Sequence, residues 1–507
     1  MSVVSKVAWR NIWRYKGKSL IIGIILIVGT FIMTVGNGII SGMEKGLNDN
    51  IPDLFTGDIV LISDEQQKNQ VLFEMMGTPI KVIKNYQQLE KILQKEEMIE
   101  DFLPVAAGTV LLFNPGSELY NIMLIGIDIE KYLSFFPDSI QITAGKMLEP
   151  GERGILISEY TRDSLYDLMD YWLLPENEEL NESQLPTEDR DNYKELELRK
   201  DVVFMGISTS NSALDVKVPV KGIMKYKALN QLWGNYSLVD IESFREAHNY
   251  VTGQDSLIKL SPEDESLLST ESMDALFSFD SIMLNLTVTE ENLSYEMIQE
   301  EMIKEDNHYV LDTGSFNMIF VRLKEGVAQK EAINRLNGLF RENNIAIRAI
   351  SWADAMGTVG SMAGLIKASL NIFIIFIFIV ASIVIMNTLT MAAVERIPEL
   401  GMMRAVGARK GFLRRMFISE TVLISAFFGG IGILSGIGII HLIKQANITT
   451  TNELLQMIYG GNKLYPVISL YDLLFGIIEL FFVTFLSVIY PLKLVGKIVP
   501  LDAIARE

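Results

Sequence analysis

Four long stretches of apolar residues, almost free of charged side chains, constrain this chain more than any other feature. Each is long enough to cross a hydrocarbon core of about 30 Å as an α-helix that rises about 1.5 Å per residue. The sequence therefore predicts a membrane α-helical fold. The expected transmembrane helices occupy residues 19–41, 366–394, 416–443 and 470–492.

Basic residues gather at three places beside these helices. Residues 1–18 hold five basic and no acidic side chains, residues 394–415 hold six and two, and residues 491–507 hold three and two. Because the whole chain has a net charge of −19, the remaining residues carry −29. Lysine and arginine are enriched on the cytoplasmic side of membrane proteins, so the three basic segments are expected in the cytoplasm.

This orientation places the other segments. The first helix should remain as an anchor, because its apolar run is too long for a cleavable signal peptide. We expect a multi-pass protein of the cell inner (cytoplasmic) membrane, with a large periplasmic domain at 42–365 and a short periplasmic loop at 444–469. The expected cytoplasmic segments are an amphipathic N-terminal helix at 1–18, a loop at 395–415 and a tail at 493–507.

The segment 42–365 alternates short strands with amphipathic helices, which predicts an α+β domain. One lobe begins with a strand at 56–63, and a second contains a helix at Gln329–Glu342. Between these lobes we expect a middle insertion at about 141–305. The chain has no cysteine, so the domain depends on its own core. The fold class is thus membrane α-helical (four transmembrane helices) with a large α+β extracytoplasmic domain inserted between helices 1 and 2.

Three details refine the helices. Residues 42–50 and 351–370 lack a strong helix breaker, so the first two helices are expected to continue outside the membrane as stalks. Gly432 and Gly436 have the small-xxx-small spacing that favours close helix packing. Glu479 lies inside the fourth helix, where an ionisable group either has a functional role or is hydrogen-bonded to a neighbouring helix.

The cytoplasmic loop 395–415 mixes charged and apolar residues. Its apolar residues lie on a short segment with nothing of its own to pack against. Such a face lies on the membrane or in the groove of a partner protein. The apolar residues concerned are Leu400, Met402, Met403, Ala405 and Val406.

The string "ERIPELGMMRAVGARKGFLRRMFISE" in this loop resembles the cytoplasmic loop of the FtsX/MacB/LolC-LolE permeases, which are ABC transporter permeases of the mechanotransmission class (type VII). The pattern in that family is roughly E-R-x-x-E-[IL]-G-x-x-[KR]-A-[VIL]-G-A. The N-terminal "AWRNIWRYKGKS" is similar to the family's amphipathic helix, and "YPLKLVGKIVPLDAIARE" is similar to its C-terminal signature. The three motifs occur in the family's order.

The resemblance implies that the loop is a coupling helix that docks in a cleft of a separate ATPase. This chain would then be a non-catalytic membrane subunit with no cofactor of its own, and ATP and Mg would bind the partner. Met402 and Met403 stand at variable positions, where a flexible side chain can fill an irregular groove. The expected docking residues are Glu395, Arg396, Glu399, Leu400, Gly401, Met402, Met403, Arg404, Ala405, Gly407 and Ala408.

The resemblance also implies partners and a function. The expected partners are two copies of the ABC ATPase, a second permease copy or paralogue, membrane lipid, and a periplasmic carrier or adaptor; nucleic acid is not among them. ATP-driven movement of the coupling helices would change the periplasmic domain, and the main expected function is release of lipoproteins from the inner membrane. The alternatives are MacB-like efflux of drugs, peptides or toxins, and FtsX-like regulation of cell-wall hydrolases.

Two other function classes find little support in the sequence. Gly17-Lys18-Ser19 looks like the end of a phosphate-binding loop, but Ile12 stands where the first glycine should be and a membrane helix follows. The three histidines, His248, His308 and His441, are widely separated, which disfavours a histidine-based metal site or catalytic triad.

Overall fold

The computed structural model describes residues 10, 13–14, 16–73, 79–113, 119–169, 171–180, 197–206, 214–252, 314–452, 455–456 and 459–496. The expected N-terminal helix and the end of the tail lie mostly outside these residues, as does much of the expected middle insertion. The chain divides into two compact units, residues 1–55 with 358–507 and residues 56–357. We call them the membrane unit and the outer domain and describe each by itself.

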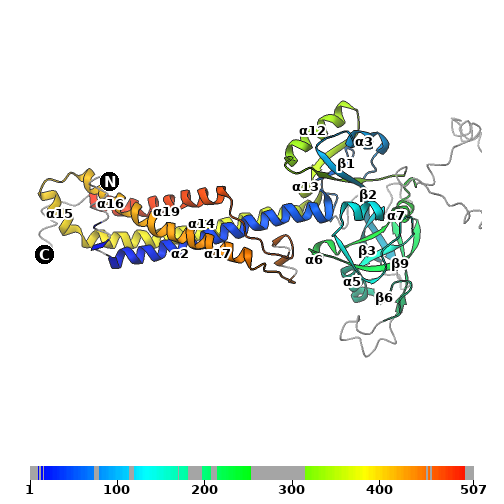
Figure 1. The fold of residues 1–507 in the computed structure, drawn as a ribbon, viewed down its shortest axis with the longest axis horizontal. Coiled ribbons are helices and arrows are strands. Elements are labelled where there is room, and N and C mark those ends of the chain that lie inside the picture. The colour runs from blue at the N-terminus through cyan, green and yellow to red at the C-terminus, as the bar shows by residue number, and fades with distance from the viewer. Residues whose placement is uncertain are drawn as a thin grey trace, which may run out of the picture. The chain divides into compact units, whose positions relative to one another are not determined.

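Four helical spans in the described part of the membrane unit are long and apolar enough to cross a membrane. In Figure 1 they pack lengthwise, with α2 against α14 and α17, and α19 against α14 and α16. The third span is interrupted by a π-helical turn, η6. The elements are α2 (Lys16–Ile51), α14 (Thr358–Glu395), α16 (Lys410–Ile424), η6 (Ser425–Gly429), α17 (Gly430–Gln445) and α19 (Leu470–Gly496).

Two of these helices extend past the lengths that a membrane needs. α2 continues to Ile51 and gives way at Pro52 to a π-helical turn, η1 (Pro52–Thr56). α14 begins at Thr358. The expected uninterrupted helix from residue 351 is broken, because Gly357 has a positive φ of 58° that separates α14 from the short α13 (Trp352–Met356).

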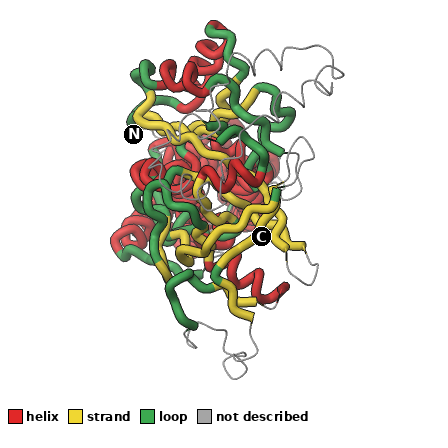
Figure 2. Tube along the Cα trace, turned by 90° about the vertical axis from the view of Figure 1, so that its right-hand side faces the viewer, coloured by secondary structure: helices red, strands yellow, loops and turns green. Residues whose placement is uncertain are grey.

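The outer domain is built on a sheet with the strand order β12-β1-β11-β2-β3-β10-β5-β9-β4, and β8 pairs with both β2 and β9. Its strands are drawn in yellow in Figure 2. A separate parallel pair joins β6 to β7. The strands are β1 (Ile59–Ser63), β2 (Ile99–Phe113), β3 (Leu119–Ile127), β4 (Ile140–Gly145), β5 (Ile155–Ser158), β6 (Tyr171–Leu173), β7 (Glu197–Arg199), β8 (Asp201–Gly206), β9 (Asp215–Tyr226), β10 (Tyr236–Asp240), β11 (Met318–Leu323) and β12 (Ile347–Ser351).

The long strand β2 belongs to two parts of this sheet. Its first half pairs with β11, and its second half pairs with β3. Because β1 lies between β11 and β12, the two α+β segments that we expected to form separate lobes pair with each other. The second half of β2 and β3, which come from the first of these segments, pair instead with β8 and β10 of the chain between them. Strand pairing across more than 250 residues leaves no local trace in a sequence, so the sequence pattern did not predict these pairings.

Helices cover the sheet with their apolar faces. α12 (Gln329–Glu342) has the predicted bounds and buries Ala332, Leu336 and Phe340. Residues of β12 such as Ala349 join the same hydrophobic cluster. The remaining described helices of the domain are α3 (Tyr86–Leu93), α4 (Ile129–Phe135), α5 (Glu159–Met169), α6 (Asn230–Trp233) and α7 (Ile241–Ala247).

His248, directly after α7, is a buried histidine of this core. Its ring stacks on Phe244 with 4.1 Å between centroids, and its Nδ1 lies 3.1 Å from the Phe244 carbonyl oxygen. Gly108 of β2 leaves space for the ring, since a Cβ there would lie 3.2 Å from its Nε2. Burial lowers the pKa of His248 below its usual 6.5, although hydrogen bonds to Phe244 and Thr109 oppose this shift.

The outer domain is therefore expected to lose stability as the pH falls through about 6.5. The unfolded chain takes up a proton on His248 there and the folded chain does not, so unfolding becomes more favourable by at most about 1.4 kcal/mol per pH unit. His248→Phe keeps the stacking and removes this dependence. Amide hydrogen exchange of β2 and β3 in the full chain, corrected for its intrinsic pH dependence, measures the effect. His441→Phe, at an exposed position on α17, should retain it.

Candidate partner-docking helix

The cytoplasmic connection between the second and third spans is a short helix, α15 (Ile397–Ala405), at the end of the helical bundle in Figure 1. Pro398 stands in its first turn, where a missing N–H group costs nothing. The helix ends before Gly407, whose φ of 105° is a conformation that favours glycine. The chain then turns within three residues into α16. Pro398 thus marks the start of α15.

One side of α15 packs against the membrane helices. Leu400 is only 4% exposed and belongs to the cluster that contains Leu413 and Phe417 of α16. Ile397 and Met403 pack against the same cluster. The expectation that these apolar residues have nothing of their own to pack against was therefore wrong for Leu400 and Met403. The cluster is built by other helices, among them α14 with Leu389 and Ala393, and α15 packs against α14. The local sequence does not reveal this packing.

The opposite side of α15 is exposed and apolar. Met402 is 55% exposed, and Val406, immediately after the helix, is 91% exposed. Ala405 is exposed between them. Positions 402, 405 and 406 share one helix face because they are three or four residues apart. This exposed face is the part of the loop that is available to a partner.

Two ion pairs fasten α15 to its surroundings. Arg396, at its N-terminal end, donates from Nη1 to both carboxylate oxygens of Glu420 on α16, at 2.7 and 2.9 Å. Both side chains are buried, with 9% and 7% of their surface exposed. Arg14, ahead of α2, lies 3.0 Å from Glu399 and is largely exposed. The buried pair holds α15 against the third span, so that the two should move together.

The eleven predicted docking residues therefore divide by location. Arg396, Leu400 and Gly401 are buried and hold α15 in place. Val406 is not in this motif-based set, although it is the most exposed apolar residue of the loop. Its apolar side chain was the sequence signal that could have identified it as a docking residue. Glu420 was also missed, because its partner is 24 residues away. Of the rest, Glu395, Met402, Ala405 and Gly407 are exposed, and Glu399, Met403, Arg404 and Ala408 are partly buried.

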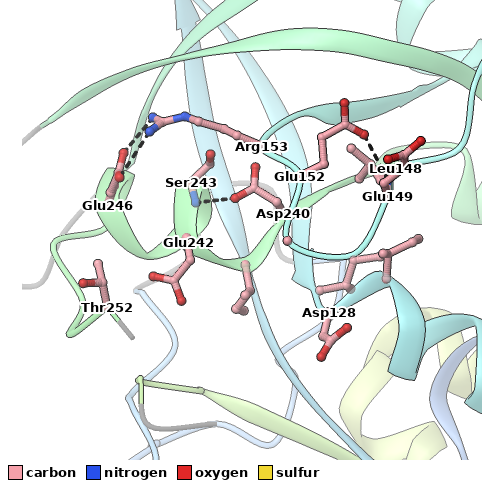
Figure 3. A pocket seen from close by; sticks show the side chains of 14 residues that line it. Asp128, Leu148, Glu149, Glu152, Arg153, Asp240, Glu242, Ser243, Glu246 and Thr252 are labelled. Atoms are coloured by element: carbon pink, nitrogen blue, oxygen red, sulfur yellow. Dashed lines mark hydrogen bonds and ion pairs between the residues drawn. The ribbon is translucent and has the colours of Figure 1, made fainter. Parts of the chain in front are cut away.

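The outer domain contains a second candidate, an acidic pocket of about 120 Å³ (Figure 3). Asp240 caps α7 by accepting from the Ser243 backbone N–H and also accepts from Gly154 N, both at 2.9 Å. Arg153 forms an ion pair with Glu246 at 2.7 Å. Burial raises the pKa of Asp240, although these hydrogen bonds oppose it. Asp240, Arg153 and Glu246 thus join α7 to the loop before β5.

A comparison with known proteins finds a family match within the membrane unit. Residues 371–500 match the family described as FtsX-like permease C-terminal. This segment is therefore of the FtsX-like permease type. The matched residues begin within α14 and include α15 and α19. The chain is a multi-pass membrane protein with a large domain outside the cytoplasm.

Individual relatives match shorter parts of this permease. The ABC transporter permease YtrF of Bacillus subtilis is 41% identical over 68 residues, which are 13% of this chain and 16% of YtrF. The macrolide export ATP-binding/permease protein MacB of Chromobacterium violaceum is 26% identical over 198 residues, 38% of this chain and 28% of MacB. The chain thus spans less than a third of the length of these curated relatives.

Among solved structures, the periplasmic region of MacB from Actinobacillus actinomycetemcomitans aligns with 64% of this chain and 97% of its own length. The sequence identity is 10% and the TM-score is 0.27.

Proposed function

We propose that this permease is the membrane subunit of an ABC transporter of the MacB type. ATP hydrolysis on a partner ATPase would move α15 and, through it, the membrane helices. The observation that carries the proposal is an exposed apolar face on α15, at Met402, Ala405 and Val406, on a helix that a buried ion pair joins to the third span. Two ATPase copies and a second permease copy or paralogue complete the assembly.

The long helices give this proposal its lever. α2 has 36 residues and α14 has 38, which correspond to lengths of roughly 54 and 57 Å at about 1.5 Å per residue. These two helices also carry the chain into and out of the outer domain. A displacement of α15 would reach that domain through them. Cargo would then be moved by changes in the outer domain, with an adaptor or carrier outside the membrane as a further partner.

Efflux of drugs, peptides or toxins is the cargo function that we favour. The named relatives include macrolide exporters, and none of those above is named for lipoprotein release. The comparisons therefore favour the efflux alternative over lipoprotein release. Since these matches cover a minority of each relative, export remains a proposal whose cargo must be measured.

The double variant Met402→Asp with Val406→Asp is expected to weaken binding of the partner ATPase to the chain at least about tenfold, because it buries charge in an apolar groove. Because both side chains are exposed here, the variant should still insert and fold. The two measurements are the fraction of the ATPase that co-purifies with the variant and the stimulation of ATP hydrolysis by the permease.

The conservative double variant Met402→Leu with Val406→Ile is the control. It should keep both ATPase binding and ATPase stimulation. Leu400→Asp is unsuitable as a test, since it places a charge inside the permease's own packing. If no ATPase accompanies the wild-type chain, or if the aspartate variant binds it normally, the docking assignment is wrong.

A further inference from the structure

The membrane unit has an open cavity of about 760 Å³ between α2, α14 and the start of α19. α2 lines it with Asn37, Ser41, Glu44 and Asn48, which are spaced four, three and four residues apart. That spacing places them on one face of the helix. Asn37 and Ser41 lie within the expected membrane span, where a polar side chain faces protein or a water-filled cavity rather than lipid. Glu44 and Asn48 continue the stripe into the expected stalk, so the cavity lies at the outer end of the span.

Two carboxylates of α19 line this cavity, and they differ in their hydrogen-bond partners. Asp472 accepts hydrogen bonds from Ser41 Oγ at 3.0 Å and from the Ser469 backbone N–H at 2.9 Å. Glu479, two helical turns further along, has a buried Oε2 without a hydrogen-bond partner among the described residues. A carboxylate removed from water without a partner is costly. Glu479 thus brings to the groove a buried carboxylate oxygen without a partner among the described residues.

Glu479 also lines a second cavity, of about 500 Å³, between α14 and α19. Apart from Glu479 and Ser382, every residue lining it is apolar, and Phe378, Ile383 and Phe482 are examples. A cavity that carries acidic side chains and an apolar groove therefore meet at Glu479. A ligand that fits both must itself have a polar end and an apolar body.

The acidic side chains of the first cavity determine the sign of the charge that the ligand's polar end must carry. Glu44, Asp49, Asp472 and Glu479 line it together with a single cationic residue, Lys45. In the described part of the chain no group of three acidic or histidine side chains could hold a metal ion. An organic cation satisfies both observations, and a protonated amine donates the hydrogen bonds that Glu479 can accept.

We propose that Glu479 anchors the protonated amine of an amphiphile whose apolar body lies along the groove between α14 and α19. The site stands on this groove alone and would remain if α15 had no partner. Both an amine-bearing lipid and a soluble amine-bearing drug have the required chemistry. This assignment gives the buried Oε2 of the partly buried Glu479 a ligand at the meeting point of the two cavities.

The test uses the full-length chain in phosphatidylcholine nanodiscs and a photoreactive twelve-carbon amine, with the matched twelve-carbon alcohol as the uncharged probe. Wild-type chain should be labelled saturably by the amine at lower concentration than by the alcohol. Glu479→Gln should raise the half-saturating amine concentration at least about tenfold and leave the alcohol unaffected. Glu325→Gln, which removes an exposed carboxylate of the outer domain, should behave as wild type.

Two further variants separate binding from folding. Glu479→Asp keeps the charge and should retain the preference for the amine, whereas Ile383→Trp should fill the apolar groove and reduce labelling by both probes. Phosphatidylethanolamine in the nanodisc would compete if the natural ligand is a lipid, and a soluble tertiary-amine amphiphile would compete if it is a drug. Equal labelling of wild type by the two probes, or undiminished amine labelling of folded Glu479→Gln, would overturn the proposal.

Discussion

Replacing Gly432 by leucine is expected to separate α17 from α2, so that most molecules fail to fold. A Cβ at Gly432 would meet Thr30 Oγ1 and lie 2.5 Å from the Ile27 carbonyl oxygen. At Gly436 it would lie 2.8 Å from the Cβ of Thr34. The close packing predicted from the Gly-xxx-Gly spacing is therefore confirmed, and it is made against α2. Overpacking this contact should cost about 3 kcal/mol or more.

The same helix supplies a matched control for this prediction. Gly438, two residues beyond Gly436, has nothing within 4 Å of the position its Cβ would occupy. Gly438→Leu should therefore leave the stability nearly unchanged. The measurement is the temperature at which half of the detergent-solubilised protein leaves the monodisperse size-exclusion peak. Equal losses for the two leucine variants would show that α17 does not pack through Gly432.

Replacing Arg396 by methionine is expected to destabilise the membrane unit by about 3–5 kcal/mol. The substitution leaves the Glu420 carboxylate buried without its cation, and breaking such a pair from one side carries this cost. Glu420→Leu alone should be comparably harmful. The double variant should recover most of the loss, because an apolar pair of similar volume removes both charges. The apparent free energy of unfolding of all four proteins completes the cycle.

Arg14 and Glu399 provide the control pair at the same end of the molecule. Their side chains are 68% and 36% exposed, so separating them should cost less than about 1 kcal/mol. If the stabilised double variant folds but no longer stimulates the partner ATPase, the buried pair also transmits movement. If the single Arg396→Met change costs no more than Arg14→Met, the two buried charges do not hold α15 in place.

Only part of the docking helix and of the amphiphile groove could be predicted from the sequence. The motif around Glu399 and Gly407 located the loop, because a short-range pattern of charges, glycine and apolar residues suffices for that. It did not separate Leu400, which packs inward, from Met402, which faces outward. Helix periodicity alone leaves open which face is covered, since the covering residues come from another helix. The amphiphile groove had a local signal, the polar stripe from Asn37 to Asn48, but its second wall comes from α19.

The sequence by itself determined the four membrane helices, their orientation, the helix Gln329–Glu342 and the position of the cytoplasmic loop. Each of these follows from hydrophobicity, charge or periodicity within about twenty consecutive residues, where neighbours along the chain are also neighbours in space. Only the tertiary structure decided that β1 pairs with β11, that Arg396 meets Glu420 and that Glu479 lies between two cavities. These contacts join residues far apart in the chain, and such pairings depend on how whole elements pack.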